Sequence, residues 1–165
     1  MGRGYLQNKE LVGYTWSQTA SMMTLKYFLA DATKYKARVH QLDFIGAFLQ
    51  AKFKNRLFVK SDSRYAYYFP EYSNYFGRAL ILLKSMYGMT NSGKLFPEYL
   101  THWLLEADFI QYQFQMSIYY KYAPYGTKIV ILSYVDDCVY CYTSEALGKW
   151  FVYTSGNIFH VNFLG

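Results

Sequence analysis

The sequence has few of the residues that build disulfide scaffolds and metal centres, since its 165 residues include only two cysteines and three histidines. Two cysteines cannot make the disulfide framework of a small secreted domain. Cys138 and Cys141 are spaced C-x-x-C, but no second Cys or His cluster lies near them to complete a zinc site. Positions three apart on a strand point to opposite faces. We therefore expect two free strand residues in a reducing compartment.

Long apolar runs are also missing. No stretch of about 18 apolar residues without charge occurs, so a membrane span is not expected. The first residues, Met-Gly-Arg-Gly-Tyr, lack the apolar region of a secretory signal. Repeats and low-complexity linkers are not found. The chain is expected to be a single domain, or part of a larger one, that is neither secreted nor embedded in a membrane.

Acidic residues are scarce in the first part of the chain. Residues 1–60 contain ten Lys/Arg against three Asp/Glu, whereas residues 61–165 contain seven against eight. This asymmetry favours a polyanionic partner on one side of the molecule, with Lys52, Lys54 and Arg56 as candidate contacts. For any single one of these residues, a solvated surface is an equally good explanation. Aromatic residues are abundant, at 22%, and suit either base stacking or a β-rich core.

Periodicity and turn residues predict an α+β fold with a mainly antiparallel sheet. A turn or short helix is expected at 45–48, a long loop at 61–78, and an irregular tail at the end. Pro97 predicts that the second long helix either begins near Phe96 or bends there. The other helices are expected at 17–38, capped by Ser17, and at 145–153. Strands are expected at 39–44, 56–60, 79–83, 118–122, 128–134 and 138–143.

Two adjacent aspartates, Asp136 and Asp137, fall at the tip of the hairpin expected from the last two strands. Like charges so close disfavour ionisation of each other unless a cation intervenes. A divalent metal would remove this difficulty and would point to chemistry on phosphates. Asp is also a favoured turn residue, and for the dipeptide taken alone a turn is the better explanation.

A third carboxylate, Asp43, lies near the end of the hydrophobic strand at 39–44. If that strand lies beside the hairpin, three carboxylates converge at one rim of the sheet. Two metal ions about 4 Å apart could then activate an attacking hydroxyl and stabilise a leaving oxygen. The order of these elements is what phosphoryl transfer in a polymerase palm requires.

Four blocks carry a family resemblance. Tyr134-Val-Asp-Asp137 and Leu42-Asp-Phe-Ile-Gly-Ala-Phe-Leu49 look like the palm motifs of reverse transcriptases. The block Lys84-Ser-Met-Tyr-Gly-Met-Thr-Asn-Ser-Gly-Lys-Leu-Phe96 and the ending Asn162-Phe-Leu-Gly165 are similar to blocks of copia-type retrotransposon polyproteins. The blocks follow the family's order over residues 14–165. The sequence therefore resembles the reverse transcriptase domain of that group.

The resemblance implies a role for each matching residue. Asp43, Asp136 and Asp137 would bind two Mg²⁺ or Mn²⁺ ions, with the carbonyl of Phe44 as a further ligand. Three positions would contact the incoming nucleotide: Ala47, Phe48 and Asn91. Tyr87 and Gly88 would shape the template side of the same pocket, and the nucleic acid would also meet Lys52, Lys54 and Arg56. A plain core position is the alternative for Phe48 and Tyr87.

The resemblance also implies an architecture and partners. It implies a palm with partial fingers, with residues 1–38 and 50–90 fingers-like and residues 39–49 and 91–165 palm-like. The thumb, the ribonuclease H and the integrase are expected outside this sequence. The partners would be an RNA or DNA template with its primer, deoxynucleoside triphosphates and other parts of the polyprotein. The location would be a cytoplasmic virus-like particle or the nucleus.

Three functions remain open from the sequence. The first is RNA-directed DNA polymerisation by two-metal nucleotidyl transfer. The second is an inactive relic that keeps the fold and binds nucleic acid through its basic first 60 residues, in a salt-dependent way. The third is a structural or partner-binding protein that uses its exposed aromatic residues.

Overall fold

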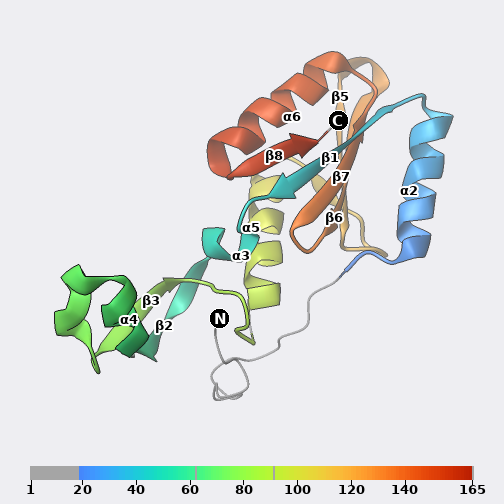
Figure 1. Ribbon diagram of the computed structural model, residues 1–165. Helices are drawn as coiled ribbons and strands as arrows, with labels where there is room; N and C mark the ends of the chain where they lie inside the picture. Colours follow the sequence, from blue (N-terminus) through green and yellow to red (C-terminus); the bar gives the residue numbers. More distant parts are fainter. Residues whose placement is uncertain (1–18, 62, 91, 165) are drawn as a thin grey trace.

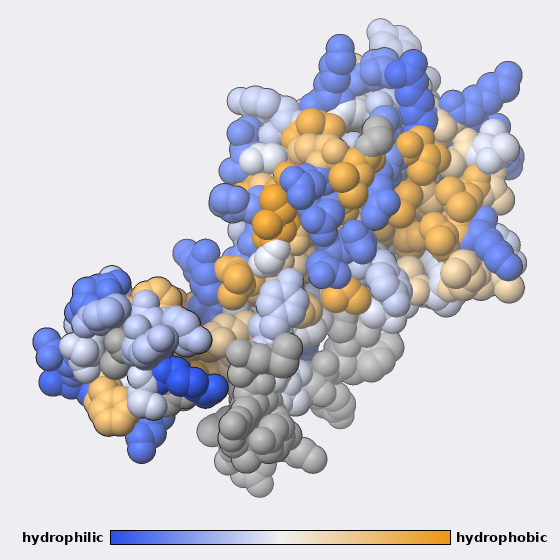
Figure 2. Space-filling view, viewed as in Figure 1, coloured by the Kyte–Doolittle hydropathy of each residue, from blue (hydrophilic) through white to orange (hydrophobic). Residues whose placement is uncertain are grey.

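The computed structural model describes residues 19–61, 63–90 and 92–164. They form two lobes, one built on a six-stranded sheet and the other on a two-stranded sheet (Figure 1), and both lobes are visible in the space-filling view (Figure 2). The larger sheet has the strand order β4-β5-β6-β7-β1-β8, and every neighbouring pair is antiparallel. Its strands are β1 Arg38–Phe44, β4 Ile110–Gln111, β5 Ile118–Ala123, β6 Thr127–Tyr134, β7 Asp137–Tyr142 and β8 Val161–Leu164.

Helices cover both faces of the six-stranded sheet. Alternate residues of its strands point to opposite faces, so each face builds its own core. On one face, Leu42 and Tyr140 pack with Leu100 of α5 (Ser92–Glu106) and Phe151 of α6 (Glu145–Ile158). On the other face, the buried residues of α2 (Met22–Lys34) pack against the sheet in a smaller cluster of Phe28, Ala32, Leu132 and Cys141. Part of this second face is not covered by α2, and a functional site could lie there.

The smaller lobe projects from the end of β1 (Figure 1). It contains β2 Lys52–Lys60 and β3 Ala79–Lys84, joined through α4 Ser63–Tyr68 and η2 Pro70–Tyr75. The short helix α3 (Ala47–Gln50) links the lobes and packs against α5 and β3. A last one-turn helix, η3 Pro124–Gly126, joins β5 to β6.

The observed architecture confirms an α+β fold with an antiparallel sheet, and it corrects several details. The first described helix begins at Met22, where the side chain of Ser21 accepts the Thr24 amide; Ser17 lies outside the described residues. The helix α5 begins at Ser92 and runs through Pro97, which costs it one intrahelical hydrogen bond. The buried Ser92 hydroxyl donates to the Met86 carbonyl at 2.5 Å and so fixes this earlier start.

Two segments expected to be irregular are in fact ordered elements. The expected loop at 61–78 contains α4 and η2, whose tyrosine-rich sequence has no apolar stripe at helical spacing. The expected tail contains β8, because Val161–Leu164 pairs along β1. Such a short strand is specified by its partner rather than by its own pattern.

The two cysteines are free and buried, and they lie in the cores on opposite faces of β7, as their spacing predicts. Among the described helices, none is both long enough and apolar enough to cross a bilayer.

Candidate active site

A row of polar side chains crosses the part of the sheet that α2 leaves uncovered. Asp43 of β1 is the direct cross-strand partner of Asp137 on β7 and of Asn162 on β8. Tyr134 of β6 is the partner of Asp137 on its other side. Directly paired residues point to the same face of a sheet. The row therefore presents two carboxylates, an amide and a half-exposed phenol, in the order Tyr134, Asp137, Asp43, Asn162.

Asp43 and Asp137 form a non-hydrogen-bonded pair of the antiparallel ladder. The amide of Phe44 donates to the Asp136 carbonyl at 2.8 Å, on the β7 side, while that of Ile45 donates to the His160 carbonyl at 2.9 Å, on the β8 side. Since this direction alternates along a strand, Asp43 directs its backbone groups toward β8. In such a pair the side chains are closest, with Cβ atoms about 4.5–5.5 Å apart. Two like charges are thus held together by the backbone.

The hairpin tip consists of Val135 and Asp136, between the paired residues Tyr134 and Asp137. Val135 has φ +55°, whereas Asp136 is not among the residues with positive φ. A positive φ at the first central residue only is the type II′ pattern, which normally uses Gly there. A β-branched residue in this conformation is strained. The strained residue thus directly precedes Asp136 and Asp137.

Gln41 is a polar neighbour of the carboxylate pair. It lies two residues before Asp43 on β1, so it faces the same side of the sheet. Its amide Nε2 donates to Oδ1 of Asp137 at 3.3 Å. On the opposite face, behind Asp137, burial and the nearby Asp137 charge raise the pKa of the Cys138 thiol, which stays protonated. Cys138 is a free, buried residue of the core on that face.

The third carboxylate, Asp136, comes from the turn rather than from a strand. Among the residues that the structure describes, no three His, Cys, Asp or Glu side chains are gathered closely enough to hold a metal ion. The backbone pairs Asp43 with Asp137, and the Phe44 amide fixes the backbone of Asp136 beside them. Because the amide and carbonyl of one strand residue point the same way, the Phe44 carbonyl also faces the hairpin turn.

The predicted nucleotide-pocket residues lie where β1 runs into α3. Gly46 has φ +60°, and its carbonyl accepts the Leu49 amide at 2.7 Å, which starts the short helix. Ala47 is fully buried. The half-buried ring of Phe48 meets Tyr87 edge to face, with centroids 4.7 Å apart. The structure therefore brings Phe48 and Tyr87 together, with Gly88 next to them at φ +83°.

The predicted basic contacts lie on the smaller lobe. Lys52 at the start of β2 is exposed and is the cross-strand partner of Lys84, which is also exposed. Two ammonium groups placed opposite each other repel, so an anion between them would stabilise the pair. Lys54 and Arg56 are on the same strand, but their side chains fall outside the described residues, as does the whole of Asn91.

Sequence reasoning missed several polar residues around the carboxylates. The side chain of Gln50 donates to the carbonyls of Ile45 and His160, both at 2.9 Å, and accepts the His160 amide at 3.0 Å. It thereby joins the end of β1 to the start of β8. Gln41 could have been found from the two-residue alternation with Asp43. Asn162 could not, because nothing in the tail predicts that it pairs with β1.

A family model described as reverse transcriptase (RNA-dependent DNA polymerase) matches residues 2–149. This span includes Asp43, the hairpin tip and the connection between β3 and α5. No curated protein matches the chain.

Proposed function

We propose a function from the premise that the chain belongs to the reverse transcriptase (RNA-dependent DNA polymerase) family, whose model matches residues 2–149. The chain is a reverse transcriptase-like polymerase domain, and its partners are those that the family implies, a nucleic acid template with a primer and deoxynucleoside triphosphates. We further assign it to the copia type of retrotransposon, because of its Lys84–Phe96 block and its Asn-Phe-Leu-Gly ending.

One observation carries this proposal: Asp43 and Asp137 are direct partners on neighbouring strands, and Asp136 adjoins them in the turn. Carboxylate and carbonyl oxygens are the ligands that Mg²⁺ prefers, so the types of donor fit the metal. Asp43, Asp136, Asp137 and the Phe44 carbonyl would hold two Mg²⁺ or Mn²⁺ ions. Since hydrogen bonds fix the backbone of Asp136, rotation of its side chain is what brings the third carboxylate in.

Two bound ions would supply activation of a primer 3′-hydroxyl and neutralisation of charge on the departing pyrophosphate. The protein's own part is to hold the reacting groups in line. The backbone pairing of β1 with β7 keeps the two strand carboxylates adjacent, and Gln41 orients one of them. The strained turn holds Asp136, which is half-buried, next to Asp137.

The nucleotide would lie over α3, with its sugar against Ala47 and Phe48. The edge-to-face contact with Tyr87 fixes the Phe48 ring, and a fixed ring at that position would exclude a 2′-hydroxyl. Asn91 would contact the nucleotide, while Gly88 and the basic residues of β2, which are Lys52, Lys54 and Arg56, would meet the template. In this scheme residues 1–38 and 50–90 form the fingers, and residues 39–49 and 91–165 form the palm.

The test is extension of a DNA primer on an RNA template by the whole chain, with Mg²⁺ or Mn²⁺ present. Wild type is compared with Asp136→Asn, which keeps the size of the side chain and removes its charge. We expect incorporation by wild type and its loss in the variant. Activity that survives the substitution would contradict the assignment. Wild-type protein that binds nucleic acid but incorporates no nucleotide would also contradict it, and that is the result expected of an inactive relic.

A further inference from the structure

A hollow lies on the same face of the sheet as the aspartates, between α2 and β5. Its volume is about 790 Å³, and aromatic rings make up much of its lining: Tyr27, Phe28, Tyr112, Phe114, Tyr120 and Tyr122. It shares the face because Tyr120 and Tyr122 pair with Val130 and Lys128. Val130 in turn pairs with Cys141, which alternates with Val139 and Asp137 along β7. We call this hollow the aromatic groove.

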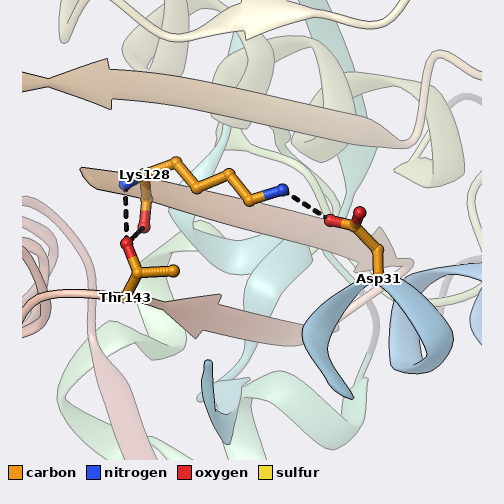
Figure 3. A network of polar contacts seen from close by, with 3 residues as sticks. All are labelled: Asp31, Lys128 and Thr143. Atoms are coloured by element: carbon orange, nitrogen blue, oxygen red, sulfur yellow. Dashed lines mark hydrogen bonds and ion pairs between the residues drawn. The ribbon is translucent and has the colours of Figure 1, made fainter. Parts of the chain in front are cut away.

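Polar bridges join the two walls of the aromatic groove. In one bridge, Gln115 Nε2 donates to Thr24 Oγ1 of α2 at 3.1 Å and to Ser117 Oγ at 2.9 Å. In the other, Lys128 Nζ donates to Asp31 Oδ2 of α2 at 2.7 Å (Figure 3). Thr24 and Asp31 are seven residues apart on one helix, so the bridges are about 10 Å apart. The groove is therefore formed before any ligand arrives.

A third residue, Thr143 of the neighbouring chain segment, holds the backbone of Lys128 in place. Its hydroxyl accepts the Lys128 amide at 2.9 Å and donates to the Lys128 carbonyl at 3.4 Å (Figure 3). The Thr143 amide also donates to that carbonyl, at 3.0 Å. The Lys128 ammonium lies 3.5 Å from the ring centroid of Tyr35. Lys128 thus has a structural role, because its ammonium pairs with Asp31 and offsets the charge of that carboxylate.

Several rings of the aromatic groove turn toward solvent rather than into the core. Tyr27 is 70% exposed, Phe114 78% and Tyr122 64%. Phe114 touches Tyr112 edge to face at 5.7 Å, and Tyr122 touches Tyr120 in the same way at 5.6 Å. An edge-to-face contact covers at most one face of a ring, so the opposite face stays available for stacking. This geometry suits a ligand with flat unsaturated rings more than an aliphatic one.

The charge along the α2 wall is positive. Lys26, Lys34 and Lys36 are exposed on or just after the helix, while Lys128 neutralises Asp31, the helix's own acid. Lys34 lies over the Tyr35 ring at 5.4 Å, close to the end of the groove that Lys128 closes. Exposed stacking rings together with exposed cations on the neighbouring helix are the combination that holds single-stranded nucleic acid without sequence preference.

We propose that the aromatic groove binds single-stranded nucleic acid, with its bases stacked on Tyr27, Phe114 and Tyr122 and its phosphates along Lys34 and Lys36. At about 3.4 Å per stacked base, the 10 Å between the bridges accommodates about three nucleotides. This extends the proposed function by adding a contact for the same class of partner away from the carboxylates. It does not require that the chain polymerise.

The test measures fluorescence anisotropy of a labelled oligothymidylate, about 12 nucleotides long, with the whole chain at several salt concentrations. We expect the double variant Tyr27→Leu with Phe114→Leu to bind about tenfold more weakly, because leucine keeps the surface apolar but cannot stack. The slope of log affinity against log salt should stay unchanged, since no phosphate contact is removed. Replacing Lys34 and Lys36 by Gln should make that slope shallower.

Tyr125 provides a matched control, because it is fully exposed on η3 and does not line the groove. Tyr125→Ala should bind like wild type. Wild-type affinity in the leucine double variant overturns the proposal and leaves the groove to a protein segment, which leucine still suits. An equal loss in Tyr125→Ala also overturns it. Asp136→Asn separates the two proposals, since it should stop incorporation and leave this binding intact.

Discussion

Asp43 on β1 and Asp137 on β7 are direct cross-strand partners on the part of the six-stranded sheet that α2 leaves uncovered. The backbone sets this proximity, since the amide of Phe44 binds the Asp136 carbonyl one residue further along the ladder. Gln41 donates to the carboxylate of Asp137, and Asp43 is also the cross-strand partner of Asn162 on β8. A pair of like charges held in this way costs stability unless a cation lies between them.

The cost of this pair predicts a stabilising substitution. Asp43→Asn should raise the free energy of unfolding by about 0.5 kcal/mol in the presence of a chelator, because it removes one of two opposed charges. Urea unfolding followed by circular dichroism measures the difference. Added Mn²⁺ should stabilise wild type more than the variant, since a ligand that binds only the folded state raises its stability. An equal response of both proteins to the metal would contradict the assignment of Asp43 as a ligand.

The strained turn predicts a second stabilising substitution. Val135 has φ +55°, which costs a β-branched residue about 1–3 kcal/mol. Val135→Gly should stabilise the fold by about 1 kcal/mol, after the entropy that glycine loses on folding is included. Val135→Ala is the control, because alanine keeps a Cβ and most of the strain. A glycine variant no more stable than the alanine variant would show that the turn is relaxed.

The sequence predicts most of this sheet but only part of the site. The strands of the hairpin and the strand of Asp43 follow from apolar runs bounded by turn residues, and they place the carboxylates at one rim. The pairing of β8 with β1 does not follow, because four residues hold too little pattern. The sequence therefore did not predict the position of Asn162 or the hydrogen bond from Gln50 to His160. The helices within 61–78 were missed because their tyrosines have no helical stripe.

Close packing at Gly148 predicts a sensitive position. A Cβ at this residue of α6 would lie 2.5 Å from the ring of Tyr142, which is buried in the core beneath it. Gly148→Ala should destabilise the protein by about 1–3 kcal/mol, as overpacking does. Gly93→Ala in α5 is the matched control, since a Cβ there meets nothing within 4 Å. Equal thermal midpoints for the two variants would show that the helix shifts to accept the methyl group.

Buried acids on β7 predict a loss of stability at alkaline pH. Burial raises the pKa of Cys141 from 9.0 to about 11, and that of Tyr140 from 10.0 to about 12. The folded state therefore retains protons that the unfolded state releases, so the contribution of these two groups to stability is constant below about pH 9 and is lost as pH rises toward 12. Urea unfolding midpoints, measured at intervals of roughly one pH unit between pH 8 and pH 11, would detect this loss of stability.

Cys141→Ala should flatten the alkaline fall between pH 9 and pH 11, because it removes one of the groups that the unfolded state deprotonates first. The comparison uses the slope with pH and not the absolute stability, since the smaller side chain also leaves a cavity. A variant with the wild-type slope would indicate that the Cys141 thiol ionises equally in both states.

The central claim is that Asp43 and Asp137 are the paired carboxylates of a nucleotidyl-transfer site. The most direct test is the rate of the first deoxynucleotide addition to a primer on RNA, with Mg²⁺ present and the chain saturated with primer and template. The account predicts that Asp137→Asn lowers this rate at least about 100-fold, as removal of a group that stabilises transition-state charge does. It also predicts unchanged binding of the primer and template. A variant that extends the primer at the wild-type rate would contradict it.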